Sequence, residues 1–261
     1  MGKITEALKK AADDRLQRIE KINKIKEKRI LLVKKVGDSK VDPRIVTYFD
    51  SKALISEQYK ILRTNLLSLN KGKSPRTVVI TSSIHSEGKT ITSLNLSISI
   101  AQATQKPRVL LIDADMRRGK VQKYLGVEHG IGLSEVLSGK ADVADALFKI
   151  DLDNLTFMAS GEVPANPAEL LDSDNMRHLL ADMKTQFDYV IIDSPPIISV
   201  TDSGIIAPMV DGVLMVIQAG RTQRGMVQRA TELLEQSNAK IFGHVLTNIE
   251  YHLPEYIYRY L

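Results

Sequence analysis

The sequence predicts an α/β fold with a mostly parallel central sheet and helices on both faces. Short runs of apolar, often β-branched residues alternate with helix-length amphipathic segments. Nearly all of these runs are apolar on both faces, as buried parallel strands are. A chain of 261 residues with 43% hydrophobic content also suffices for one large domain. The expected strands span residues 77–82, 108–114, 155–160, 189–194, 212–218 and 241–247.

Two helices are expected before the first strand. Residues 3–35 carry isoleucine and leucine mostly at three- and four-residue steps among many lysines, which predicts an amphipathic helix. It either packs on the domain or a neighbour, or acts as a membrane-surface or partner-docking arm. The second helix, 56–70, begins with Ser56 as its expected N-cap. We expect three units: a basic helical extension (1–36), the main domain (37–250) and a tyrosine-rich C-terminal tail (251–261).

Composition restricts the kind of protein. Most of the formal charge of +5 lies in residues 1–35, which hold twelve Lys/Arg against five Asp/Glu, so the main domain is nearly neutral and gives no sign of binding nucleic acid. No cysteine is present, which excludes disulfides and thiolate metal sites and is compatible with a reducing compartment. No apolar run approaches the roughly 20 residues that span a bilayer. We therefore expect a cytoplasmic protein.

The segment SEGKT, residues 86–90, follows the first strand and opens a helix expected at 90–103. This is the context of a phosphate-binding loop, in which backbone N–H groups and the helix N-terminus hold phosphate oxygens. Lys89 is expected to reach the β- and γ-phosphates, and the Thr90 hydroxyl to bind Mg²⁺. The usual pattern has a glycine where this chain has Ser83. The residues expected around the phosphates are Ser86, Glu87, Gly88, Lys89, Thr90 and Ile91.

Acidic residues end two further strands. Asp113 and Asp115 follow the run VLLI, and Asp193 ends FDYVIID, a pattern similar to the Walker B motif whose carboxylate holds magnesium. Taken alone, the first pair can be a helix cap and turn, and Asp193 an ordinary strand end. Buried carboxylates at one sheet edge are costly unless a cation neutralises them. The three elements together predict a site for ATP and Mg²⁺.

Several segments resemble the bacterial tyrosine kinases of exopolysaccharide and capsule synthesis: SSIHSEGKT, VLLIDADMRRG, SGEVPANPAELL, FDYVIIDSPPIISVTD and YHLPEYIYRYL. The resemblance covers roughly residues 50–261. That family belongs to the deviant-Walker class, with the ParA/MinD ATPases and the nitrogenase iron protein. Ile84 stands where ParA and MinD carry a signature lysine, and the iron protein needs cysteines. These two features favour the kinase branch.

The resemblance implies transfer of the ATP γ-phosphoryl group to a tyrosine. Asp113 would orient the incoming hydroxyl and accept its proton, while Thr90 and Asp115 hold Mg²⁺ and Asp193 acts on it through water. Asp113 and Asp115 can exchange these roles, since spacing alone does not decide. Asn248 would contact the adenine.

Acceptors and assembly are also implied by the resemblance. The expected phosphoacceptors are Tyr251, Tyr256, Tyr258 and Tyr260, although an edge strand in which alternating tyrosines cover an apolar surface is the alternative. A face carrying Glu57, Lys60 and Arg63 would join subunits into a homo-oligomer, possibly a ring, unless it is merely a solvated helix face. A transmembrane polysaccharide co-polymerase would hold the protein at the inner membrane.

The sequence is compatible with alternatives at three points. His85 and Ser86 stand where the family commonly has Pro and Gly, so Ser86 adopts either a strained positive φ or an ordinary conformation. Asp202 lies either in the outer magnesium shell or at a helix cap. The alternative functions are a ParA/MinD-like ATPase switch and a weakly active ATP-binding scaffold for a membrane co-polymerase.

Overall fold

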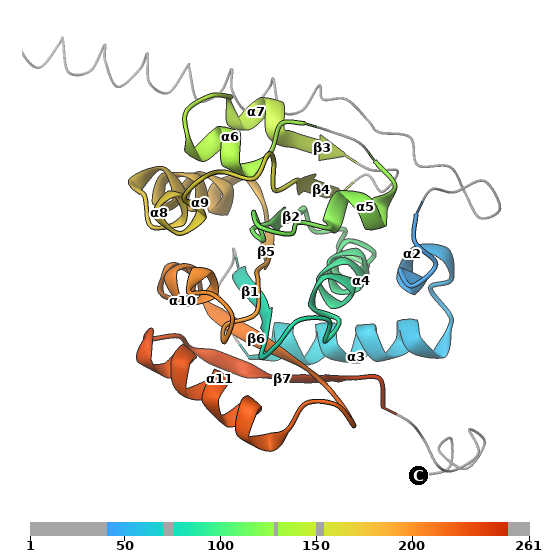
Figure 1. Cartoon of the computed structure of the whole chain (residues 1–261). Coiled ribbons are helices and arrows are strands. Elements are labelled where there is room, and N and C mark those ends of the chain that lie inside the picture. Colours follow the sequence, from blue (N-terminus) through green and yellow to red (C-terminus); the bar gives the residue numbers. More distant parts are fainter. Residues whose placement is uncertain (1–40, 70–75, 128–129, 150–153, 250–261) are drawn as a thin grey trace, which may run out of the picture.

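The computed structural model describes residues 41–69, 76–127, 130–149 and 154–249, which form one seven-stranded sheet flanked by helices (Figure 1). The sheet order is β3-β4-β2-β5-β1-β6-β7. All neighbours are parallel except β3, which pairs antiparallel with β4. The strands are β1 (Arg76–Ser82), β2 (Val109–Asp113), β3 (Leu147–Lys149), β4 (Leu155–Met158), β5 (Tyr189–Asp193), β6 (Gly212–Gln218) and β7 (Ile241–Thr247). The predicted α/β class and all six expected strands are confirmed.

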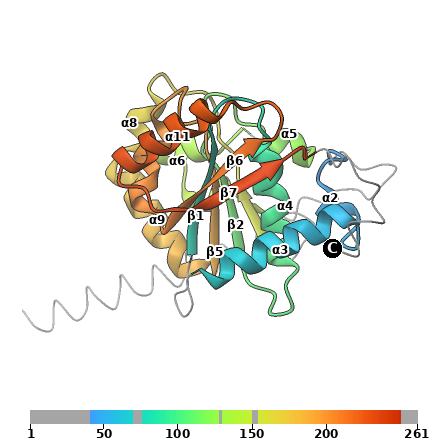
Figure 2. The ribbon, with the colours of Figure 1, turned by 90° about the horizontal axis from the view of Figure 1, so that it is seen from below.

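Helices cover both faces of the sheet. Figure 1 shows α2, α3 and α4 on one side and α9, α10 and α11 on the other, and Figure 2 shows the same division for α2, α3, α4, α9 and α11. The helices are α2 (Val46–Phe49), α3 (Leu54–Ser68), α4 (Lys89–Ala101), α5 (Val121–Leu125), α6 (Leu133–Leu137), α7 (Val143–Ala146), α8 (Pro167–Leu171), α9 (Asp174–Gln186), α10 (Asp202–Ile206) and α11 (Arg224–Gln236), with a 3₁₀ turn, η1 (Ala207–Met209).

Alternating side chains of the strands build two separate cores. Val78 and Ile80 of β1 pack in the core that contains the buried residues of α4, whereas Val79 packs in the core beneath α9 and α11. Because side chains alternate along a strand, a run that is apolar at every position serves both cores. This explains why the central strands carry no polar face.

Parallel pairing brings the acidic strand ends together. Asp113 at the end of β2 is the register partner of Asp193 at the end of β5, and Asp193 is in turn the partner of Ile80 in β1. The chain passes from β1 through α4 to β2, so β5 lies between two strands that are consecutive in sequence. Ligands of open parallel sheets bind beyond the carboxyl ends of such strands.

Ser56 does not cap the second helix as expected. Helix α3 begins two residues earlier, at Leu54, and Ser56 is buried inside its first turn. The Ser56 hydroxyl instead donates a hydrogen bond to the Asp50 carbonyl (2.6 Å), which ties α3 to the preceding turn.

The expected extension (1–36) and tail (251–261) lie outside the described residues. Among the helices that the structure does describe, none has the length and apolar character needed to cross a bilayer.

Candidate functional site

The loop between β1 and α4 has the backbone of a phosphate-binding turn. Gly88, immediately before α4, has φ +94°, and Ser86 has φ +66°. Ser86 therefore adopts the strained alternative, which costs a non-glycine residue about 1 kcal/mol. Gly88 is needed for its conformation, because a side chain there would be strained at this φ.

The side chain of Glu87 holds this loop in place. It is 1% exposed, and its carboxylate accepts hydrogen bonds from the backbone N–H of Ile84 (2.7 Å) and of Gln218 (3.3 Å), and from the Thr222 hydroxyl. The Thr247 hydroxyl donates to the Glu87 carbonyl (2.7 Å). The sequence indicated only that Glu87 lies in the loop. Its links to β6 and β7 join residues more than 130 positions apart and could not be read from spacing.

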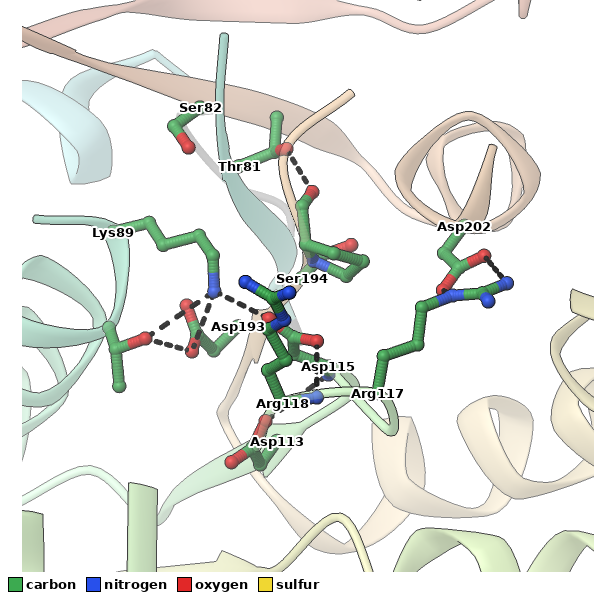
Figure 3. Close-up of polar contacts among 12 residues, drawn as sticks. Thr81, Ser82, Lys89, Asp113, Asp115, Arg117, Arg118, Asp193, Ser194 and Asp202 are labelled. Carbon is green, nitrogen blue, oxygen red and sulfur yellow. Dashed lines mark hydrogen bonds and ion pairs between the residues drawn. The ribbon is translucent and has the colours of Figure 1, made fainter. Parts of the chain in front are cut away.

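Lys89 lies among the acidic strand ends. Its Nζ is 3.0 Å from Asp115 Oδ2 and 3.7 Å from Asp193 Oδ2, and Figure 3 shows these groups converging. Burial acts to lower the pKa of Lys89, but the negative charges of Asp193 and Asp115 outweigh it and raise the pKa above its ordinary value. Lys89 is therefore a fixed positive charge at this edge of the sheet.

Asp193 is fully buried and joined to the first turn of α4. Thr90 Oγ1 donates to Asp193 Oδ2 (2.6 Å), and Ser93 Oγ donates to Asp193 Oδ1 (3.1 Å). Burial raises the pKa of Asp193, and Lys89 opposes that effect. Ser93 was not among the expected site residues. Its position four residues after Lys89, on the same face of a helix, was the available signal.

Asp113 and Asp115 have different surroundings. Asp113 is 1% exposed, and its two oxygens accept backbone N–H groups of Asp115 (3.2 Å) and Val121 (3.0 Å). Burial, followed by the charge of Asp193, raises the pKa of Asp113 to about 7. Asp115 contacts Lys89 and the backbone N–H of Arg118 (3.0 Å).

A cavity of about 350 Å³ opens beside the loop, and of the two aspartates only Asp115 lines it. The loop and α4 contribute His85, Ser86, Gly88, Lys89, Thr90 and Ile91. Other segments contribute Arg44, Asp115, Arg118, Lys120 and Tyr124. The expected phosphate-loop residues thus share one cavity, except for Glu87, whose side chain points into the protein.

The donor set fits magnesium bound together with phosphates. Over the described residues, no three His, Cys, Asp or Glu side chains are arranged to hold a metal by themselves. Mg²⁺ in nucleotide sites needs only one or two protein oxygens besides the phosphates and water. Thr90 and Asp193 supply a hydroxyl and a carboxylate in contact, and three carboxylates around one lysine leave negative charge for a cation to neutralise.

Asp202 does not cap a helix, which was one of its two expected roles. It is the first residue of α10, is fully buried, and makes no capping hydrogen bond. Both its oxygens accept from Arg117, at 2.9 Å and 3.1 Å. This pair joins the start of α10 to the turn that follows Asp115, across 85 positions of sequence.

The remaining predicted residues lie outside this cavity. Asn248, with φ +54°, lines a second cavity between α3 and β7. On α3, Glu57 and Lys60 form an exposed ion pair (2.7 Å). Arg63 turns inward and donates to the Ser99 carbonyl of α4 (2.5 Å), because α3 packs along α4. The Arg63 guanidinium therefore serves a contact within the chain.

The fold and this cluster define a nucleotide-binding protein of the phosphate-loop class. A family model described as an AAA domain matches residues 76–241. A tyrosine-protein kinase of Bacillus subtilis, YwqD, is 34% identical over 83% of this chain and 90% of its own length. The tyrosine-protein kinase CpsD of Streptococcus agalactiae is 39% identical over 77% of this chain and 86% of its own. The kinase domain of the Escherichia coli tyrosine kinase ETK superposes with a TM-score of 0.69, at 32% identity over 76% of this chain and 78% of that domain. This chain belongs to the family of bacterial tyrosine-protein kinases.

Proposed function

We propose that this protein transfers the γ-phosphoryl group of ATP to its own tyrosines. The observation that carries the proposal is the convergence of Lys89, Thr90, Asp115 and Asp193 at the carboxyl ends of three neighbouring strands. The family membership supports the same reaction. Ile84, which replaces the signature lysine of the ParA/MinD switches, gives no support to the alternative of an assembly ATPase.

The loop and Lys89 would bind and orient the triphosphate. Gly88, Lys89 and Thr90 at the start of α4 line the cavity, and the backbone N–H groups of a helix N-terminus stabilise bound anions. Lys89, held by Asp115 and Asp193 before nucleotide arrives, would neutralise charge on the β- and γ-phosphates. When bound, Mg²⁺ would offset the charge that develops on the transferring phosphoryl group, with Thr90 and Asp193 as its protein partners.

Asp115 is our choice for the group that accepts the tyrosine proton. A general base must come within hydrogen-bond reach of the proton it takes. Both aspartates accept two hydrogen bonds, but Asp115 lines the cavity and Asp113 does not. Asp113 would instead position Asp115 through the backbone N–H of Asp115. Asp115 thus takes the role first expected for Asp113, and Asp193 takes the magnesium contact first expected for Asp115.

In the transfer step, a bond forms between the tyrosine Oη and the γ-phosphorus. The bond from that phosphorus to the β,γ-bridging oxygen breaks, and ADP leaves with the electron pair. The hydroxyl proton passes to Asp115. The acceptors we propose are Tyr251, Tyr256, Tyr258 and Tyr260, all outside the described residues.

We also propose assembly of several copies through α3, at the inner membrane beside a transmembrane polysaccharide co-polymerase. Leu54, Ile55 and Ile61 of α3 are each about half exposed or more, which supports a contact surface on this helix. Although Asn248 lines the second cavity, we propose it as the adenine contact because it follows Thr247, whose hydroxyl donates to the Glu87 carbonyl of the loop. The tyrosine-phosphorylated protein would regulate polymerisation or export of a capsule or exopolysaccharide.

Incubation of the full chain with ATP and Mg²⁺, followed by mass-spectrometric mapping of phosphotyrosine, tests the proposal. Phosphotyrosine is expected in the wild type and absent in Lys89→Met. The exposed Lys52→Met variant is the matched control and should retain the wild-type level. Phosphate release without phosphotyrosine would contradict the kinase assignment, and thermal unfolding of Lys89→Met verifies that it is folded.

A further inference from the structure

We propose that Arg118 and Lys120 form a basic rim that selects tyrosines preceded by an acidic residue. This inference rests on the proposed function, since it specifies which tyrosines the same site accepts. Tyr251, which follows Glu250, and Tyr256, which follows Glu255, would then be phosphorylated faster than Tyr258 and Tyr260. The latter two follow Ile257 and Arg259.

The charges of the cavity support this assignment. Lys89 and Asp115 pair with each other, which leaves Arg44, Arg118 and Lys120 as the other charged side chains of the lining. Arg44 is committed to Asp42 (2.8 Å) and lies over the ring of Tyr124. The Arg118 guanidinium and the Lys120 ammonium are exposed and contact no acceptor in the described part of the chain. They are therefore the positive groups that an incoming acid can meet.

The backbone holds this rim beside the proposed proton acceptor. The N–H of Arg118 donates to Asp115 Oδ1 (3.0 Å), and the N–H of Val121 donates to Asp113 Oδ2 (3.0 Å). Between the two basic residues, Gly119 lies so close to Asp113 and Ser160 that an added Cβ would come within 2.9 Å of Asp113 Oδ2 and 2.1 Å of Ser160 Oγ. The turn can therefore lie directly against Asp113 and Ser160 only with glycine at this position.

Neighbouring side chains of the turn diverge. Figure 3 shows Arg117 directed toward Asp202, and Arg118 directed toward the Lys89 side of the site. Consecutive Cα atoms are about 3.8 Å apart. When a tyrosine hydroxyl reaches Asp115, the residue before that tyrosine therefore has its Cα about 3.8 Å from the Cα of the tyrosine. A carboxylate there would meet Arg118 or Lys120, which follow Asp115 by three and five positions.

The occupant we assign to the rim is the segment 250–261 of this chain. Charge complementarity supports it, because Glu250 and Glu255 each immediately precede a tyrosine. The described chain also ends close to the loop. The hydroxyl of Thr247, two residues before the last described residue, donates to the Glu87 carbonyl, and Thr247 Cγ2 lies 3.5 Å from where a Cβ on Gly88 would be. The segment therefore starts beside the site of its own chain.

The test is the initial rate of phosphorylation of each tyrosine in the full chain, measured by quantitative mass spectrometry with ATP and Mg²⁺. Glu255→Gln should slow Tyr256, and Ile257→Glu should speed Tyr258, each about twofold to fivefold, the range of one solvent-exposed ion pair. Both effects should disappear in the double variant Arg118→Gln, Lys120→Gln, and should weaken as salt is raised. The rate of each tyrosine in a variant is compared with the rate of the same tyrosine in the wild type, so its distance along the chain from the site is constant.

Unchanged rates in Glu255→Gln and Ile257→Glu would overturn the proposal. A double variant of Arg118 and Lys120 in which Glu255→Gln and Ile257→Glu still change these rates would also overturn it. So would a double variant that raises the KM for ATP and slows all tyrosines equally, because the rim would then bind the nucleotide. Absence of phosphotyrosine at every position would contradict the proposed function itself, which distinguishes the two failures.

Discussion

Thr90 Oγ1 donates a hydrogen bond to Asp193 Oδ2 across 2.6 Å and so joins the first turn of α4 to the end of β5. Ser93 reinforces this connection from the next turn. The carboxylate is fully buried beside two other acids and one lysine, which is an arrangement suited to a bound cation and triphosphate rather than to stability.

The first prediction concerns Asp193→Asn in the absence of nucleotide and magnesium. Burial raises the pKa of Asp193 in the folded state, so ionisation of this carboxyl weakens the folded state. Stability is therefore lost as pH rises from the pKa of the unfolded chain to the pKa of the folded one. The variant should therefore melt above the wild type, with a difference that grows as pH rises above the ordinary aspartate pKa of about 4. Each kcal/mol of unfolding free energy corresponds to a shift of about 2–4 °C in the melting temperature. Thermal unfolding measures it.

Asp188→Asn is the matched control, because the pKa of Asp188 is shifted in the opposite direction to that of Asp193. Burial acts to raise the pKa of Asp188, but hydrogen bonds from Arg108 outweigh it and lower the pKa. Its ionised form stabilises the protein above the unfolded pKa, and this contribution is lost as pH falls through the folded pKa. Asp188→Asn should melt below the wild type at neutral pH and match it in acid. An Asp193→Asn variant that melts lower at every pH would contradict the account.

The second prediction concerns the left-handed residue of the loop. A β-branched side chain is strongly disfavoured at the φ of Ser86, so Ser86→Val should weaken ATP binding about tenfold or more, whereas Ser86→Gly should bind at least as well as the wild type. His85→Val, one position earlier and without a positive φ, is the control and should change affinity less than twofold, within the roughly 0.5 kcal/mol typical of surface substitutions. Titration calorimetry gives all three affinities. Equal losses for both valine variants would show that loop conformation is not the cause.

The third prediction concerns the pair between Arg117 and Asp202. Arg117→Ala leaves a fully buried carboxylate without its partner, which should cost about 1–3 kcal/mol of unfolding free energy. Arg177→Ala removes an arginine from the exposed pair with Asp172 and should cost less than about 1 kcal/mol. Urea unfolding compares them. Equal costs would mean that Asp202 rearranges to reach water.

The fourth prediction concerns the proposed contact surface of α3. Ile61→Asp should reduce oligomer formation in analytical ultracentrifugation without lowering the melting temperature, because Ile61 is 53% exposed and contributes little to the core. Gln228→Asp, exposed on α11 across the sheet, is the control and should leave association unchanged. A wild type that is monomeric at high concentration would contradict the proposed assembly.

Most of the fold could be predicted because its signals are local. Each of the six expected strands is a run of apolar residues long enough to be recognised, and the residues after the runs indicated the site. Strand β3 was missed because it has only three residues, too few for a periodicity. Ser56 was misplaced because a serine before an apolar run has the same composition whether it caps the helix or lies in its first turn.

The parts of the site that escaped prediction depend on tertiary contacts. Lys89, Thr90, Asp115 and Asp193 were predicted from motifs, and the structure brings them together. The pairing of Arg117 with Asp202 and the hydrogen bonds of the Glu87 carboxylate join segments far apart in sequence, and many other partners have the same chemistry. Spacing likewise could not separate Asp113 from Asp115, because only the folded turn shows which of them lines the cavity.

The central claim is that Lys89, Thr90 and the acidic strand ends form one pocket for a magnesium-bound triphosphate. Calorimetric titration of ATP with and without Mg²⁺, on the wild type and on Thr90→Val, tests it most directly, with Thr104→Val, exposed after α4, as the control. We predict that Mg²⁺ strengthens ATP binding to the wild type and to Thr104→Val, and that this dependence disappears in Thr90→Val. Wild-type binding that is the same with and without Mg²⁺, or no binding at all, would contradict the account.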